Sequence, residues 1–467
     1  MAFPEITAAL KITTALLVLV LSNACSPHPG SYAPAAEDLK LPARFDGSSA
    51  SVPEMATSLS RLFPSPELRS LMARAIHNNP DLAISGARLR EAGFNASRAQ
   101  AGFYPNLSGT MGNDRSQSNS AGRGFETGTF ITEQYNFGLD TRWEIDVWGR
   151  LRAGLSAADA DRAAAAADYA AAHQSIAAQT AQAYFELITA TRLQDLSQRS
   201  LESFQQTQER VNRRFEKGLA TLGDLNLAKS DLASTRTRLI ERRDLRNQAA
   251  RRLTALLGTY PDQSFRASEF PSLRRSLPAG LPSSLLRLRP DIEAAYQRIR
   301  AADSRVTVAH RDLFPTFALT GSAGRRSSKL KDLKSAQFDV WSIGTSLTAP
   351  LFQAGSLRAA LGAANARAEA AFSTYRSTVL TALQEVENAL GSQEALSARE
   401  AAATQALAAA RTAEDRLQSS YESGLTPLLD LLTLRRRSIN TEEALISIQG
   451  ARYQNRVTLA LALGRAH

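Results

Sequence analysis

The side chains that most often carry catalysis are few and scattered in this sequence of 467 residues. It contains no HExxH motif, which would place two histidines on one helix face for a zinc ion, and its histidines do not cluster. They are His28, His77, His173, His310 and His467. Gly122 and Gly124 lie in a Ser/Gly-rich stretch and not between a strand and a helix, so they do not form a phosphate-binding loop. The sequence therefore predicts no enzyme, no metal site and no cofactor.

The single cysteine is the residue whose position suggests a chemical modification. One Cys excludes an intramolecular disulfide and a CxxC site. Cys25 follows an apolar run, residues 12–21, that is too short to span a bilayer and ends in small residues, as at the cleavage site of a secretory signal. This arrangement resembles the lipobox of bacterial lipoproteins, in which the cysteine is lipidated and becomes the mature N-terminus.

Two departures from the lipobox leave an alternative open. Glu5 lies in the n-region, and Ser22 stands where Leu is usual, so a plain signal peptide with an incidental cysteine also fits. We expect a signal peptide at 1–24 and a lipid-anchored segment, carrying palmitate at Cys25, over 25–65. That segment is rich in Pro, Ser and Ala and is expected to be extended.

The composition favours long helices. Hydrophobic residues make up 43% of the chain, which argues against disorder, and aromatic residues are sparse at 7% while Ala is abundant. The formal net charge is +10, but the basic residues are spread along helical segments beside Glu and Asp. Because no patch of basic and aromatic residues stands out, we expect no nucleic-acid partner.

Residues 134–147 alternate strictly between apolar and polar side chains. Tyr135, Phe137, Leu139, Trp143 and Ile145 share one parity, and polar residues or glycine occupy the other. This pattern predicts a β-strand with one apolar and one polar face. It fits an exposed strand of a soluble sheet, and it fits a membrane strand that faces lipid on one side and a lumen on the other.

The strand and the long Ala-rich helix that follows it occur twice. Pro105 and Pro315 are 210 residues apart, and Gly218 and Gly424 are 206 apart, which indicates an internal duplication with a small insertion. The first repeat, 66–258, is predicted to hold a helix, strands 105–115 and 134–147, a long helix 149–217 and a helix 221–257. A connecting segment covers 259–286. The second repeat, 287–467, is predicted to hold a helix, strands 315–323 and 339–351, a long helix 354–423 and a helix 427–464.

Each long helix is predicted to end in a tight turn. Gly218 and Gly424 fit the left-handed position just past a helix C-terminus. Thr221 and Asp224 have capping-box spacing, and Thr426 is predicted as an N-cap with Pro427 at the first helical position. The outgoing helix of the second repeat shows heptad spacing at Leu425, Leu432, Ile439 and Ile446.

Four strands are too few to close a membrane barrel, which needs about eight or more and no open edge. If these strands cross a membrane, several chains must share one barrel. Two chains would give eight strands and three would give twelve, and symmetry alone does not choose between them.

These features together resemble one family. The duplicated plan, the segment Trp143–Gly149, the two glycine turns and the Cys25 signal are similar to the outer-membrane factors, in the lipoprotein branch of the TolC-like channels that serve RND-type efflux pumps. The resemblance covers the chain from about residue 66 onward. It implies an internally duplicated α+β membrane protein. Each chain of a homotrimer would give four strands to a shared transmembrane β-barrel that continues into a long α-helical barrel in the periplasm.

The resemblance also implies a function. The protein would be the outer-membrane channel of a tripartite efflux system, a passive conduit that exports drugs and other toxic small molecules and so confers multidrug resistance. Its partners would be a periplasmic adaptor (membrane fusion) protein, an inner-membrane RND-type transporter and outer-membrane lipid. It would lie in the cell outer membrane, lipid-anchored.

Site residues follow from the positions that match the family. Leu429 would form an apolar ring at a periplasmic gate, and Asp430 and Asp224 would form acidic rings, although Asp224 equally suits a helix cap. The family often has a further Asp where this chain has Thr433. Adaptor docking would use the turns at Gly218, Leu219, Gly424 and Leu425.

Two basic groups suggest further contacts. Arg210, Arg213, Arg214 and residues 435–437 lie near the turns, where they would pair with Glu422 or Asp430 or form a solvated helix face. The polar loops 112–133 and 322–338 would face outside the cell. The second carries Arg325, Arg326, Lys329, Lys331 and Lys334 against Asp332, and we hypothesise that it contacts lipopolysaccharide phosphates.

Two other functions remain open. The channel could serve type I protein secretion or metal efflux, since the sequence does not name the cargo. The chain could also be a lipid-tethered coiled-coil scaffold, which would leave the two matching strand pairs unexplained.

Overall fold

The computed structural model describes residues 31–32, 45, 62–120, 128–273 and 288–464. The predicted signal peptide, Cys25 and most of the predicted extended segment lie outside the described residues. Among the described residues, none of the helices combines the length and the apolar composition that crossing a membrane requires.

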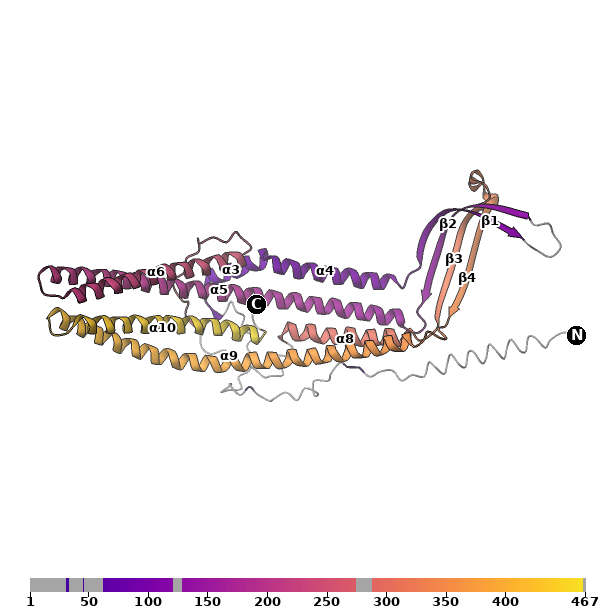
Figure 1. Ribbon diagram of the computed structural model, residues 1–467. Coiled ribbons are helices and arrows are strands. Elements are labelled where there is room, and N and C mark those ends of the chain that lie inside the picture. The colour runs from indigo at the N-terminus through magenta and orange to yellow at the C-terminus, as the bar shows by residue number, and fades with distance from the viewer. Residues whose placement is uncertain (1–30, 33–44, 46–61, 121–127, 274–287, 465–467) are drawn as a thin grey trace. The chain divides into compact units, whose positions relative to one another are not determined.

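Among the described residues, both repeats contain a helix, two strands and two further helices in that order (Figure 1). The first repeat has one more helix at its start, and the second has two 3-10 helices between its strands. The first contains α3 (Pro66–Asn78), α4 (Pro80–Ala101), β1 (Asn106–Ser120), β2 (Gly128–Ile145), α5 (Arg150–Glu216) and α6 (Leu222–Leu256). The second contains α8 (Pro290–Arg311), β3 (Thr316–Ser327), the 3-10 helices η2 (Leu330–Lys334) and η3 (Ala336–Phe338), β4 (Asp339–Thr348), α9 (Ser356–Glu422) and α10 (Leu428–Ala462). Both α5 and α9 have 67 residues, which corresponds to about 100 Å at 1.5 Å per residue.

The chain divides into two compact units, and α5 and α9 contribute to both. The first unit includes residues 89–165 and 295–375 and contains the sheet. The second includes residues 166–294 and 376–467 and contains α6, α10 and the turns that precede them.

The sheet of the first unit is antiparallel throughout, with the order β1-β2-β3-β4. Its register gathers the apolar side chains on one face, because Leu139 pairs with Gly109 and Ala323, and Ala323 pairs with Trp341. The face is open in the single chain. Its most exposed apolar residues are Leu107, Met111, Ile131, Phe137, Leu139, Trp341, Ile343 and Leu347, which are 51–78% exposed. The predicted two-faced strand is therefore confirmed.

The strand ends differ from the prediction. β1 continues to Ser120 and β2 begins at Gly128, so the loop between them is shorter than the predicted 112–133. The extension is held by backbone pairing, such as Gln117 with Ile131, which a run of polar residues does not reveal. β4 ends at Thr348, before the predicted residue 351, and Pro350 has no backbone N–H to donate to the ladder.

Two glycines bring β2 and β3 close together. Gly138 pairs with Gly324, and a Cβ at position 324 would lie 2.3 Å from the backbone oxygen of Phe137. Position 324 therefore requires glycine, because backbone atoms cannot move aside as a flexible side chain can.

The joint between β2 and α5 is fixed by polar contacts. Asp146 accepts hydrogen bonds from the backbone N–H groups of Leu151 (3.0 Å) and Arg152 (2.9 Å) at the start of α5. Trp148 Nε1 donates to the backbone oxygen of Pro315 (2.6 Å) at the start of β3. The helix therefore begins at a set position relative to two strands.

In the second unit the duplication is visible as matching contacts. Asn79 Nδ2 donates to the oxygen of Leu256 (3.0 Å), and Arg289 Nη1 donates to the oxygen of Ala462 (3.1 Å). The first members of these pairs are 210 residues apart and the second members 206, as in the sequence. The predicted internal duplication is thus present in three dimensions.

Candidate functional site

The two helix turns of the second unit have the same backbone geometry. Gly218 and Gly424 have φ values of +72° and +76°, as predicted. The next N–H closes each turn: Leu219 donates to Arg214 O (2.8 Å) and Leu425 donates to Ser420 O (2.9 Å). This is the Schellman arrangement, in which the residue after the glycine satisfies a carbonyl of the last helical turn. We call residues 217–221 and 423–427 the tip turns.

The helices that leave the tip turns start differently. At α6 the predicted capping box is present: Asp224 accepts from Thr221 N (3.0 Å), and Thr221 Oγ1 accepts from Asp224 N (3.1 Å). At α10 the prediction is wrong. Pro427 is the N-cap and makes no side-chain cap bond, and Thr426 Oγ1 is buried with no hydrogen-bond partner among the described residues. Thr426 lies one position too early to reach the free N–H groups of the first turn.

The residues assigned to a gate differ in their surroundings. Leu429 is 53% exposed and Asp430 is exposed, so both are available to line a passage. Asp224 is half-buried, and its carboxylate is engaged in the capping box. The docking leucines are still more open, with Leu219 at 65% and Leu425 at 78%.

A small apolar core lies behind the tip turns. Phe204 and Val211 of α5 pack with Leu225 of α6 and with Leu428 and Leu432 of α10. Ile439 packs against this core and Ile446 is buried further along α10, so these positions of the predicted heptad face inward. Leu425 of the same heptad lies in the turn and is exposed. The core thus holds the helices together while the turn leucines remain outside it.

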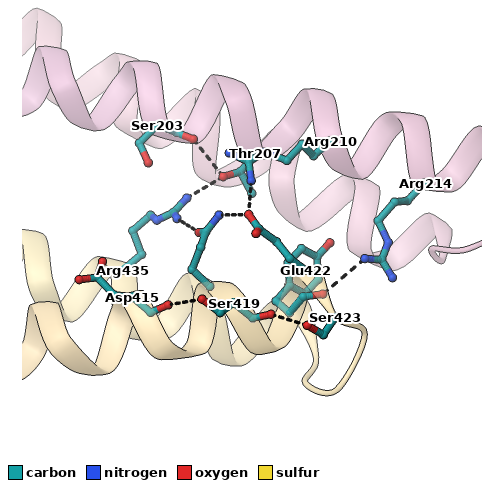
Figure 2. A network of polar contacts seen from close by, with 11 residues as sticks. Ser203, Thr207, Arg210, Arg214, Asp415, Ser419, Glu422, Ser423 and Arg435 are labelled. Carbon is teal, nitrogen blue, oxygen red and sulfur yellow. Dashed lines mark hydrogen bonds and ion pairs between the residues drawn. The ribbon is translucent and has the colours of Figure 1, made fainter.

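Polar contacts join α5 to the end of α9 (Figure 2). Arg210 Nη1 lies 2.6 Å from Glu422 Oε1, which is one of the two pairings expected from the sequence. Arg214 donates to the backbone oxygen of Tyr421 (3.4 Å), and its guanidinium lies 5.1 Å from the centre of the Tyr421 ring. Burial raises the pKa of Tyr421, and the nearby arginines oppose that rise.

Arg435 is a buried cross-link that sequence reasoning did not identify. Its side chain is only 7% exposed and binds three helical side chains: Glu414 Oε1 (2.9 Å), Thr207 Oγ1 (2.6 Å) and Gln418 Oε1. The sequence presents Arg435 as part of a solvated basic run. The sequence did hold one sign of its burial. Arg435 follows Leu432 by three residues and Leu431 by four, and this helical spacing places it on the same inward face as these two buried leucines.

β3 continues to Ser327, so Arg325 lies in this strand and not in a loop that begins at residue 322, as predicted. From the strand it holds the basic loop that leads to β4. Arg325 Nε binds Asp339 Oδ1 (2.7 Å), and Arg325 Nη1 donates to the oxygens of Leu333 (3.2 Å) and Lys334 (3.1 Å). Arg325 therefore has a structural role and is not free for a phosphate. The neighbouring cations are Arg326 at the end of β3 and Lys329, Lys331 and Lys334 in the loop.

Cys25, the predicted lipidation site, lies outside the described residues. Two residues shortly after it are described and bind α8. Ser31 Oγ donates to Asp303 Oδ2 (2.5 Å), and Tyr32 N donates to both Asp303 oxygens (3.1 Å each). The chain is therefore held against the first unit six residues after Cys25.

Comparison with known proteins identifies the family. The sequence profile described as outer membrane efflux protein matches residues 71–259 and 281–465, which are the two repeats. The chain belongs to the outer membrane efflux protein family. Because the members are efflux channels, the expectations of an outer-membrane channel and of a protein that is not an enzyme are confirmed.

Several named relatives agree over most of the chain. The pyoverdine export outer membrane protein OpmQ of Pseudomonas aeruginosa is 31% identical over 86% of each chain. The cation efflux system protein CusC of Escherichia coli K12 is 27% identical over 85% of this chain and 86% of its own. Among solved structures, the outer-membrane channel OprN is 29% identical with a TM-score of 0.85, covering 94% of this chain and 99% of its own. The expected α+β membrane fold with internal duplication is therefore confirmed.

Proposed function

We propose that this channel is the outer-membrane conduit of a tripartite efflux system for small organic molecules, and that it works as a homotrimer. One observation supports placing the sheet in the membrane. The register of the sheet puts its apolar side chains on a single face, where Trp341 is 78% and Ile343 is 70% exposed in one chain. Lipid would cover this face, and the polar face would line the passage.

We propose two protein partners for the channel, one that covers the exposed leucines of the tip turns and one that supplies energy to a passive conduit. A periplasmic adaptor protein would cover Leu219 and Leu425, and an inner-membrane RND-type transporter would supply the energy. An exposed leucine in each of two matching turns supports an apolar contact with another protein. Replacing both leucines with Asp should lower drug resistance while leaving the amount of channel in the outer membrane unchanged. Full resistance in that variant would refute the docking assignment.

The gate assignment concerns the same end of the second unit. Leu429 and Asp430 would line its constriction, with Asp224 adding charge while it caps α6. A ring of apolar side chains in a narrow pore excludes water, so Leu429→Ser should raise the resting conductance of the channel in a planar bilayer. An unchanged conductance would remove Leu429 from the gate.

Anchoring would come from a lipid on Cys25. The contact of Ser31 and Tyr32 with Asp303 supports this, since it holds residues 31 and 32 against α8, the helix that leads to β3. The mass of the mature protein tests it directly. A chain that starts at Cys25 and carries acyl groups is expected, and an unmodified N-terminus would contradict it.

The cargo is tested by deleting the gene from its host. Antibiotics and dyes should then accumulate in the cell, while tolerance of copper and silver should stay unchanged. Loss of metal tolerance alone would favour the metal-efflux alternative, which the cation-efflux name of CusC keeps open. Loss of one secreted protein would favour type I secretion.

A further inference from the structure

Among the described residues, the joint that leads from β4 to α9 (residues 349–355) has no counterpart of the carboxylate that caps α5. At the β2–α5 joint, Asp146 accepts hydrogen bonds from the backbone N–H groups of Leu151 and Arg152. The side chain of Arg152 also pairs with this carboxylate, with Nε 3.4 Å from Oδ2. At the offset of 206 residues between the repeats, Phe352 stands at the position of Asp146 and accepts no such bonds.

The backbone of the two joints is otherwise the same. Gly149 and Gly355 have φ values of +81° and +83°, and each carbonyl accepts a hydrogen bond of 3.0 Å from the N–H four residues further on. The N–H groups of Leu357 and Arg358 therefore stand where the two that bind Asp146 stand in the first repeat. Within the part of the chain that the structure describes, neither N–H has an acceptor, as is usual in the first turn of an uncapped helix.

Arg358 adds a free cation to these donors. Its side chain is exposed and forms no hydrogen bond or ion pair with a described residue. No acidic residue lies within four positions of it in the sequence, whereas its counterpart Arg152 is held by Asp146. Two free N–H groups at a helix start and a guanidinium together favour an anion that has several oxygen atoms, such as a phosphate.

An apolar groove of about 290 Å³ adjoins the same donors. Apart from Arg358, the side chains that line it are mostly apolar: Leu313, Pro350, Leu351, Phe352 and Leu357. Leu351 is 64% exposed and Phe352 is 89% exposed. They follow the exposed Leu347 of β4, so the groove continues the apolar face that lipid covers in the proposed function.

We infer that the β4–α9 joint binds a glycerophospholipid, with its phosphate on Arg358 and the two free N–H groups and its acyl chains against Leu351 and Phe352. A free phosphate would leave the apolar side chains exposed, whereas a lipid covers them and neutralises the cation. This inference rests on the proposed function, which places the sheet in a membrane. It goes further by assigning a lipid site to the second joint and none to the first.

Three substitutions in the full-length protein test the site. Arg358→Gln removes the cation, and Phe352→Asp supplies the carboxylate that the first repeat has. Arg152→Gln is the matched control, because Asp146 already fills the equivalent place there. Phe352→Asp builds a cap at the start of α9, so its melting temperature should not fall below that of the unchanged protein.

Native mass spectrometry of the complex in mild detergent counts the dioleoylphosphatidylglycerol that each protein retains. We expect retention to fall at least about fivefold in Arg358→Gln and in Phe352→Asp, and to change less than about twofold in Arg152→Gln. Dioleoylglycerol, which has the same acyl chains and no phosphate, should be retained at least about fivefold less by the unchanged protein. Inorganic phosphate in excess should not displace the bound lipid.

Equal retention in all four proteins would overturn the site, as would equal retention of dioleoylglycerol. Displacement of the lipid by inorganic phosphate would show that the joint takes a free anion, and would overturn the lipid assignment. A complex that dissociates in Arg358→Gln while each chain retains its lipid would place a second copy on the joint instead. A monomer that stays soluble without detergent would refute the proposed function, and the lipid site with it.

Discussion

Replacing Arg435 with Met tests how the helices are held behind the tip turns. Met keeps much of the length of the side chain but removes the guanidinium that joins Thr207 of α5, Glu414 and Gln418 of α9, and α10 itself. The core beside it stays intact, so the variant should fold and reach the membrane. Opening of the helix ends near the turns should become easier.

The free-energy cost of this substitution follows from how deeply the ion pair between Arg435 and Glu414 is buried. Removing one partner of a buried ion pair costs about 3–5 kcal/mol, because the other charge is left unpaired. Glu414 has a side chain that is 21% exposed, so water can partly solvate it, and we expect about 2–3 kcal/mol. At about 1.4 kcal/mol for each factor of ten, local opening rises roughly 30- to 140-fold.

Hydrogen exchange read by mass spectrometry measures that opening on peptides covering α9, the second tip turn and α10. Arg437→Met, at an exposed neighbour, is the matched control and should change exchange less than about threefold. Adding Glu414→Gln to Arg435→Met should recover part of the loss, since it removes the unpaired charge. Exchange that rises equally in the Arg435 and Arg437 variants would refute the reasoning.

Three further predictions concern the first unit. Gly324→Ala should reduce the folded, membrane-inserted yield several-fold, because its Cβ would lie 2.3 Å from a backbone oxygen. Gly344→Ala is the control and should be tolerated, because its Cβ would meet only a threonine hydroxyl at 3.4 Å; equal yields of the two variants would contradict this. Burial raises the pKa of Asp146, but hydrogen bonds from the start of α5 outweigh it and hold the pKa below the usual 3.8. Its stabilising effect is therefore present above pH 3.8 and lost as the pH falls further, so the melting temperature of Asp146→Asn should depend less on pH below about 4; parallel curves would contradict this. Replacing the three lysines of the β3–β4 loop with Gln should weaken contact with lipid phosphates by about 1 kcal/mol for each lysine. The measurements are the retention of the protein in outer membranes and the antibiotic permeability of the cells, and no change in either would count against the contact.

The sheet was largely predictable because its signal is periodic. A strand that is apolar on one face must alternate with period two, so Phe137 and Leu139 identify the face from the order of the residues alone. The duplication then supplied the second pair of strands. The strand ends were not predictable, since the outer part of β1 is polar on both faces and is held by backbone pairing with β2.

At the tip turns, too, some features were predictable from the sequence and others were not. Gly218 and Gly424 were predictable because few residues other than glycine adopt a positive φ. Thr426 misled the prediction, since Thr and Pro both favour helix starts and the sequence does not say which is the N-cap. Arg435 was missed because a run of three arginines indicates solvent, and only its place in the apolar stripe of α10 shows that it points inward.

The central claim is that several copies of this chain form one channel in the outer membrane. The native mass of the protein, extracted from the outer-membrane fraction in mild detergent, tests it most directly. We expect a complex of three chains that requires detergent to stay in solution. A monomer that remains soluble without detergent would contradict the account.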